Sequence, residues 1–204
     1  MKDLIVLVAD SYQEKVLEEL FLRIPRSLDI EEFTFDIIRS PGHDSGCFID
    51  GHEMLRPLIN QYKYAIVVFD FEGSGAEDLS IENIDTKLSK RLADNGWRGR
   101  NLVIVIKPEL ESWIWINSRH VEYAIGWENS TSLYDWARSN NYIKTNQNKP
   151  ERPKEVFEKA LRISETSKSA AIYKKIAANV SFKNCEDPSF KKLISTLIDW
   201  FKRL

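Results

Sequence analysis

The sequence predicts an α/β protein with a mainly parallel four-stranded sheet flanked by helices and followed by a helical C-terminal region. Short apolar runs rich in β-branched residues alternate with longer stretches of helical spacing through the first half of the chain. Four such runs are present, and none follows residue 106. Strands joined through helices form parallel sheets covered on both faces, because such crossovers are nearly always right-handed.

The individual elements follow from the same patterns. Strands are expected at Leu4–Ala9, Phe33–Ile38, Tyr64–Asp70 and Leu102–Ile106. Between them we expect helices at Ser11–Arg23, at about Glu53–Gln61 and at Ile81–Asn95, with a Pro/Gly loop at Ser40–Gly51. From Glu109 onward only helices are expected, at Leu110–Trp115, Val121–Ile125, Leu133–Arg138, Lys154–Ile163, Ala170–Val180 and Pro188–Arg203.

One linker-like stretch, Asn140–Pro153, suggests a division of the chain. We expect residues 1–139 to form the α/β core and residues 140–204 to form a basic helical region packed on it. The first part holds 15 Lys and Arg against 24 Asp and Glu, whereas the second holds 14 against 7. A basic region beside an acidic one can attract DNA or RNA, although charged, solvated helix faces give the same count.

Bulk properties restrict the class of protein. With 43% hydrophobic and 29% charged residues, the composition is that of a globular protein. No apolar stretch reaches the roughly 18 residues of a membrane span, and acids interrupt the opening segment where a signal peptide needs an apolar run. We therefore expect a cytoplasmic protein without membrane contact, in which Cys47 and Cys185 are reduced thiols.

Acidic residues follow three of the expected strands. Asp10 comes after the first strand, Asp70 ends the third with Glu72 two residues later, and Glu111 follows the fourth. Ligands of open parallel sheets collect beyond the carboxyl ends of the strands, and crowded carboxylates are relieved by a cation such as Mg²⁺ or Mn²⁺. These four residues are the predicted metal ligands and catalytic residues of phosphoryl transfer. The alternative is that acids after strands only solvate loops or cap helices: Asp10 could be an N-cap, and Glu111 lies in the first turn of an expected helix, where the dipole favours it.

Several motifs resemble a known family. They are the opening LIVLVAD, the loop SPGHDSGC, the segment VVFDFEGSG, the run IVIKPELESWIW, RPKE at Arg152–Glu155 and the closing DPSF. Together they resemble the small Toprim-like component of bacterial methylation-associated anti-phage defence systems, which is allied to a Toprim-related family with a Glu-Leu-Glu-x-Trp motif. The resemblance implies a Toprim-like fold, magnesium binding and larger defence proteins as partners.

The resemblance also implies roles for particular residues. Asp10 stands in the place of the Toprim first-strand Glu, and Asp70 and Glu72 stand in the place of the Asp-x-Asp pair. Two of the three residue types therefore differ from the Toprim pattern, and Ser11 replaces the glycine that follows the first acid.

Five further residues are candidate substrate contacts. His43 and Asp44 follow the second strand and could reach the same crevice, whereas Lys107, Arg152 and Lys154 could bind phosphate. Exposed surface positions are the alternative for all five. The sequence therefore favours a Mg²⁺-dependent nuclease or phosphotransfer subunit acting on nucleic acid in defence against phage. The alternatives are a non-catalytic adaptor and a sensor subunit that binds larger defence proteins.

Overall fold

A four-stranded, all-parallel sheet forms the centre of the protein in the computed structural model, which describes residues 1–181 and 185–203. The strands are β1 (Lys2–Val8), β2 (Phe35–Arg39), β3 (Tyr62–Asp70) and β4 (Asn101–Ile106), in the spatial order β2-β1-β3-β4. Each strand except β2 is apolar on both faces, because helices cover both sides of the sheet. The predicted α/β class and the parallel sheet are confirmed.

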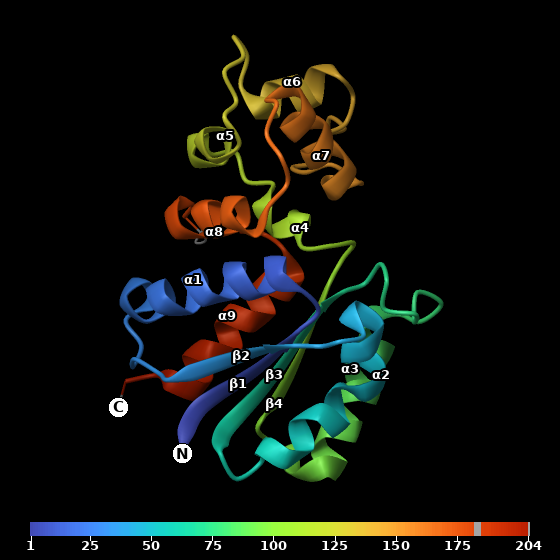
Figure 1. Cartoon of the computed structure of the whole chain (residues 1–204), viewed down its shortest axis with the longest axis vertical. Coiled ribbons are helices and arrows are strands. Elements are labelled where there is room, and N and C mark those ends of the chain that lie inside the picture. The colour runs from blue at the N-terminus through green and yellow to red at the C-terminus, as the bar shows by residue number, and fades with distance from the viewer. Residues whose placement is uncertain (182–184, 204) are drawn as a thin grey trace.

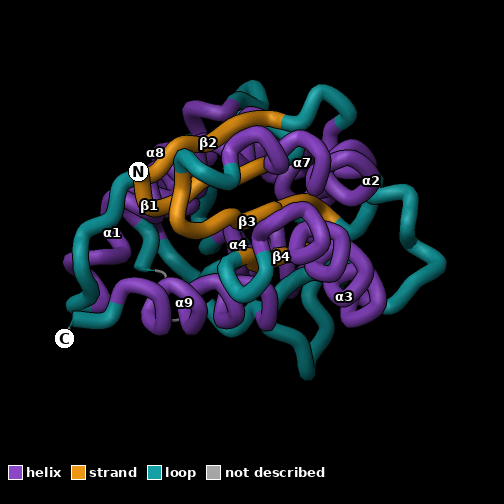
Figure 2. The backbone as a smooth tube through the Cα atoms, turned by 90° about the horizontal axis from the view of Figure 1, so that it is seen from below, coloured by secondary structure: helices purple, strands orange, loops and turns teal. Residues whose placement is uncertain are grey.

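Two helical layers enclose the sheet. Figures 1 and 2 show the strands between α1 (Ser11–Leu28) and α9 (Pro188–Phe201) on one side and α2 (His43–Leu55) and α3 (Ile81–Leu92) on the other. Because strand side chains alternate between the faces, Leu4, Val6 and Val8 pack towards α1, whereas Ile5 and Leu7 pack towards α2. The sheet is therefore the wall between two hydrophobic cores.

The segment after β2 differs from its prediction. A loop was expected at Ser40–Gly51 and a helix at about Glu53–Gln61, but α2 begins at His43 and ends at Leu55, with a short 3₁₀ turn at Arg56–Leu58. Its glycines permit close packing: a Cβ atom on Gly51 would lie 3.0 Å from the Leu7 side chain on β1. Glycine-rich composition usually indicates a loop, but in this segment the glycines allow a helix to pack closely against the sheet.

The remaining helices lie beyond the carboxyl ends of the strands (Figure 1). They are α4 (Glu111–Ile114), α5 (Arg119–Ile125), α6 (Leu133–Ser139), α7 (Pro153–Ile163) and α8 (Ala170–Asn179). The helix α8 packs along α1, and α7 contacts α4. These helices form a layer, which we call the helical cap, over the sheet edge at which the acidic residues were expected to meet.

Elements from both sides of residue 139, the expected boundary, lie in the helical cap and against the sheet. The helices α5 and α6 precede this boundary and lie in the helical cap, whereas α9 follows it and packs against β4. One hydrophobic core contains residues from Leu4 to Phe201. Residues 182–184 and 204, which belong to the expected helical region, lie outside the described residues. Among the described residues, no helix has the length and hydropathy needed to cross a membrane.

Candidate functional site

The strand order reverses direction between β1 and β3. The chain leaves β1 towards β2 on one side, and it leaves β3 towards β4 on the other. This reversal is the topological switch point at which open α/β sheets bind their ligands. Asp10 follows β1 and Asp70 ends β3, so both flank the switch point. The structure thus places two of the four predicted metal ligands together at this edge.

Asp10 is the N-cap of α1. Its Oδ1 atom accepts hydrogen bonds from the backbone N–H groups of Tyr12 (2.8 Å) and Gln13 (3.0 Å). The capping alternative that the sequence left open is therefore present. It engages one carboxylate oxygen, and a carboxylate has acceptor sites on both of its oxygens.

Gln13 connects the ends of β1 and β3. This buried side chain accepts a hydrogen bond from Ala9 N–H through Oε1 (2.9 Å) and donates one from Nε2 to Asp70 Oδ1 (2.9 Å). Sequence reasoning did not identify Gln13 as a site residue. The signal was available, because Asp10-Ser11-Tyr12-Gln13 has the spacing of a capping box, in which the third residue after the cap reaches back towards the chain before the helix.

Asp70, which ends β3, has a strongly perturbed carboxyl group. Burial raises the pKa of its carboxyl group well above the usual value, and the negative charges of Asp44, Glu111 and Asp10 raise it further. A hydrogen bond from the backbone of Leu110 opposes this shift. Four acidic residues from four different elements therefore influence one another at the switch point.

Asp44 belongs to this cluster through α2. It lies in the first turn of that helix, and its Oδ1 atom accepts a hydrogen bond from Asp70 N–H at 2.7 Å. Burial raises the pKa of Asp44, and the charge of Asp10 adds to the effect. The neighbouring His43 is exposed and lines an open hollow of about 470 Å³ together with Asp10. Both predicted substrate contacts after β2 thus lie at the acidic edge.

The two glutamates after β4 are paired with lysines of the helical cap. Glu109 is buried and forms an ion pair with Lys154 of α7. Burial lowers the pKa of Lys154, but the hydrogen bond and charge of Glu109, aided by Glu111 and Asp70, raise it to about 12. Lys154, a predicted phosphate ligand, is therefore a charged partner of Glu109 in this structure.

Glu111 is held in a second buried arrangement. Its Oε1 atom accepts hydrogen bonds from the Tyr173 hydroxyl and from Lys168 Nζ, the latter at 3.1 Å. Lys168 also pairs with Glu158 at 3.2 Å and lies 5.1 Å from the centre of the Tyr12 ring. Sequence reasoning missed Lys168 and Tyr173, because nothing local to them indicates that they face Glu111, which is more than 50 residues away along the chain.

The remaining predicted site residues are exposed and lie outside the group formed by Asp10, Asp44 and Asp70. Glu72 is exposed, and its charge acts on Glu109. Lys107 is exposed, with its ammonium 4.9 Å from the centre of the Phe71 ring. Arg152 is exposed and pairs with Glu155 at 2.6 Å. Within the described ranges, no hydrogen bond or ion pair joins these three side chains to Asp10 or Asp70.

The unpaired part of the site consists of three aspartates. Among the described residues, no ion pair includes Asp10, Asp44 or Asp70. Their oxygen donors are of the type that Mg²⁺ prefers, and Mg²⁺ is often held by one or two carboxylates, with waters and substrate phosphate completing its shell. As placed in the described part of the chain, no set of three or more acidic, histidine or cysteine side chains converges on a single point.

Comparisons with protein-family models, with curated proteins and with solved structures found no match to this chain.

Proposed function

We propose that this protein is a Toprim-like component of a bacterial anti-phage defence system and acts on nucleic acid through a Mg²⁺-dependent phosphoryl-transfer site. The observation that carries the reaction class is the position of Asp70, at the switch point and within range of the charges of Asp10, Asp44 and Glu111. The defence context rests on the sequence motifs, from LIVLVAD to DPSF. Burial raises the pKa of Asp70 and the neighbouring negative charges raise it further; a bound cation would offset that repulsion.

The residues of this chain have distinct roles in the proposed site. Asp70 and either Asp10 or Asp44 would hold the cation, while Gln13 orients the Asp70 carboxylate. A bound Mg²⁺ supplies Lewis-acid polarisation of a phosphoryl oxygen. His43 is exposed, lines the same hollow as Asp10, and would transfer a proton in the proposed reaction. Lys168 and Tyr173 hold Glu111 in place through their hydrogen bonds to its carboxylate.

A titration of Mn²⁺ and Mg²⁺ into the purified protein tests the cation site. The Asp70→Asn variant keeps an oxygen acceptor for Gln13 but removes the charge. We expect a loss of at least tenfold in cation affinity, together with loss of Mg²⁺-dependent cleavage of DNA or RNA by the assembled system. The matched control is Asp199→Asn, which removes an exposed carboxylate on α9 and should leave both measurements unchanged. Cation affinity and cleavage that survive Asp70→Asn would contradict the proposal.

A specific observation favours a second candidate, a non-catalytic adaptor subunit. Lysines of the helical cap already neutralise Glu109 and Glu111, the two acids that follow β4. This pairing stabilises the carboxyl edge without a metal. Protection assays in cells that carry the complete defence system separate the candidates, because an adaptor keeps full protection when Asp70 is replaced by Asn. A phosphoryl-transfer subunit loses protection with the same substitution.

A further inference from the structure

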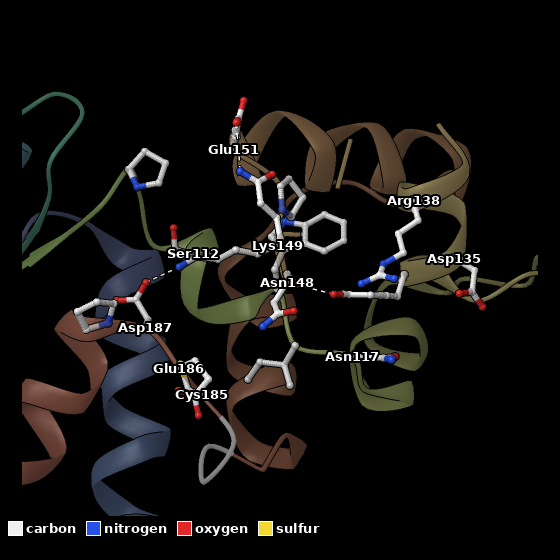
Figure 3. A pocket seen from close by; sticks show the side chains of 17 residues that line it. Ser112, Asn117, Asp135, Arg138, Asn148, Lys149, Glu151, Cys185, Glu186 and Asp187 are labelled. Carbon is white, nitrogen blue, oxygen red and sulfur yellow. Dashed lines mark hydrogen bonds and ion pairs between the residues drawn. The ribbon is translucent and has the colours of Figure 1, made fainter. Parts of the chain in front are cut away.

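The helical cap contains a cavity that is separate from the acidic edge. It has a volume of about 900 Å³ and lies between α4, α6, the segment 147–151 and the start of α9 (Figure 3). Sites for small organic ligands have volumes of about 300–1,000 Å³. The helix α4 separates the two places, because Glu111 contacts Tyr173 and Lys168 whereas its neighbour Ser112 lines the cavity.

Most of the charged side chains that line the cavity are paired with another charged residue. Lys149 pairs with Asp187, Glu151 pairs with Lys144, and Glu186 pairs with Lys191. Asp135 accepts a hydrogen bond from the Ser132 hydroxyl and points away from Asn148 in Figure 3. No ion pair within the described ranges includes Arg138.

Arg138 is positioned for an anion. Its guanidinium lies 5.0 Å from the centre of the Tyr134 ring, and the Tyr134 hydroxyl donates a hydrogen bond to the Asn148 carbonyl oxygen across the cavity. In Figure 3 the guanidinium extends from α6 towards Asn148. A planar guanidinium stacked on an aromatic ring is held in one orientation and can bind a phosphate through two parallel hydrogen bonds.

Three amide side chains supply neutral recognition groups. Asn117 and Asn148 line the cavity, and their side chains form no hydrogen bond within the described part of the protein. Gln147 donates from Nε2 to Glu151 at 3.1 Å, and its buried Oε1 atom has no donor there either. An amide offers donors and an acceptor side by side, which is also the pattern along the edge of a nucleobase. Trp115 adds an aromatic wall.

We propose that this cavity binds a nucleoside monophosphate, with Arg138 on the phosphate and the amides of Asn117, Gln147 and Asn148 on the base. The ligand is either a free nucleotide or the terminal nucleotide of a strand, since both present the same chemistry. This site is independent of the proposed phosphoryl-transfer site. Binding here requires neither Mg²⁺ nor Asp70.

Isothermal titration of the full chain tests the proposal in the presence of EDTA, which removes any contribution from a cation. The probes are AMP, GMP, CMP and UMP, each compared with its nucleoside, and inorganic phosphate. We expect one-to-one binding of at least one nucleotide, at least tenfold tighter than its nucleoside and than phosphate. A 5′-phosphorylated dinucleotide that binds as tightly as the nucleotide identifies a strand end as the ligand, whereas weaker binding identifies the free nucleotide.

Two substitutions assign the contacts. Arg138→Gln should weaken nucleotide binding at least tenfold while leaving nucleoside binding unchanged, and Asn148→Ala should weaken both. Arg162→Gln, which changes an exposed arginine on α7 outside the cavity, is the matched control and should have no effect. Because Arg138 and Asn148 are exposed, both variants should keep the wild-type melting temperature. Failure of all four nucleotides to bind at millimolar concentration, or equal binding by wild type and Arg138→Gln, would overturn the proposal.

Discussion

Replacing Tyr173 by Phe tests how the helical cap is held on the sheet. Tyr173 is fully buried, and its hydroxyl donates to Glu111, which is 3% exposed. The ring contacts with Tyr12 and Phe157, at centroid distances of 4.8 and 5.8 Å, do not involve the hydroxyl and remain in the variant. The substitution therefore removes one hydrogen bond to a buried carboxylate, an interaction that contributes about 1.5–3 kcal/mol.

Lys168 continues to neutralise Glu111 in this variant, so the expected loss in the free energy of unfolding is about 2 kcal/mol, in the middle of that range. For a protein of this length, about 2–4 °C is lost per kcal/mol, which gives a fall of about 4–8 °C in the melting temperature. Urea denaturation followed by circular dichroism measures the first quantity, and calorimetry measures the second.

The matched control is Tyr123→Phe, which removes a hydroxyl from a side chain that is 66% exposed and should change stability by less than about 0.5 kcal/mol. If Tyr173→Phe also changed the free energy of unfolding by less than about 0.5 kcal/mol, the contact with Glu111 would not stabilise the cap as argued.

Three further predictions concern the carboxyl edge and the exposed edge of the sheet. Because the pKa of Asp70 is higher in the folded than in the unfolded protein, its contribution to stability falls as the pH rises above about 4. In EDTA, Asp70→Asn should therefore stabilise the protein by about 1 kcal/mol or more at pH 8 and little at pH 4, whereas an equal effect at both values would exclude a raised pKa. Asp10→Ala should lower the free energy of unfolding by about 1 kcal/mol, because it removes the N-cap of α1. Asp10→Ser should keep the cap but weaken cation binding. Equal stability of the two variants in urea would refute the capping role. Lys192 donates a hydrogen bond to the outward-facing Val103 carbonyl of the edge strand β4, and unpaired edge groups can pair with another chain, so Lys192→Met should increase self-association in light scattering. Lys191→Met, which alters an exposed ion pair, is the control and should not. A Lys192→Met variant that stays monomeric at high concentration would contradict this prediction.

The strands and most helices were predictable because their signals are local. The apolar runs that ended at Asp70 and at Ile106 were long enough to identify buried strands, and the expected ranges agree with β3 and β4 to within two residues. The prediction misplaced α2 because glycines occur both in loops and at positions where a helix packs closely against a sheet. Composition favours a loop, whereas the close approach of Gly51 to Leu7 is a property of packing that appears only once β1 is in place.

The candidate site was predictable only in part for the same reason. The position of Asp10 and Asp70 at strand ends follows from the order of strands and helices along the chain, whereas the structure shows that these two strands are neighbours. Asp44 joins them because α2 begins at His43. The partners of Glu111 could not be predicted from the sequence. Tyr173 and Lys168 come from a distant segment, and the pattern of that segment indicates only an amphipathic helix and the residues that lead into it.

The sequence by itself determined the α/β class, the parallel sheet and the acids at its carboxyl edge, because strand periodicity and chain order are local properties. The tertiary structure decided which of those acids stay unpaired. The helical cap lies over the carboxyl edge, and there Glu109 and Glu111 form ion pairs with lysines. Asp10, Asp44 and Asp70 lie near one another and have no ion pair among the described residues. A charge is neutralised by whatever lies within a few ångströms of it, and that distance is set by packing rather than by position along the chain.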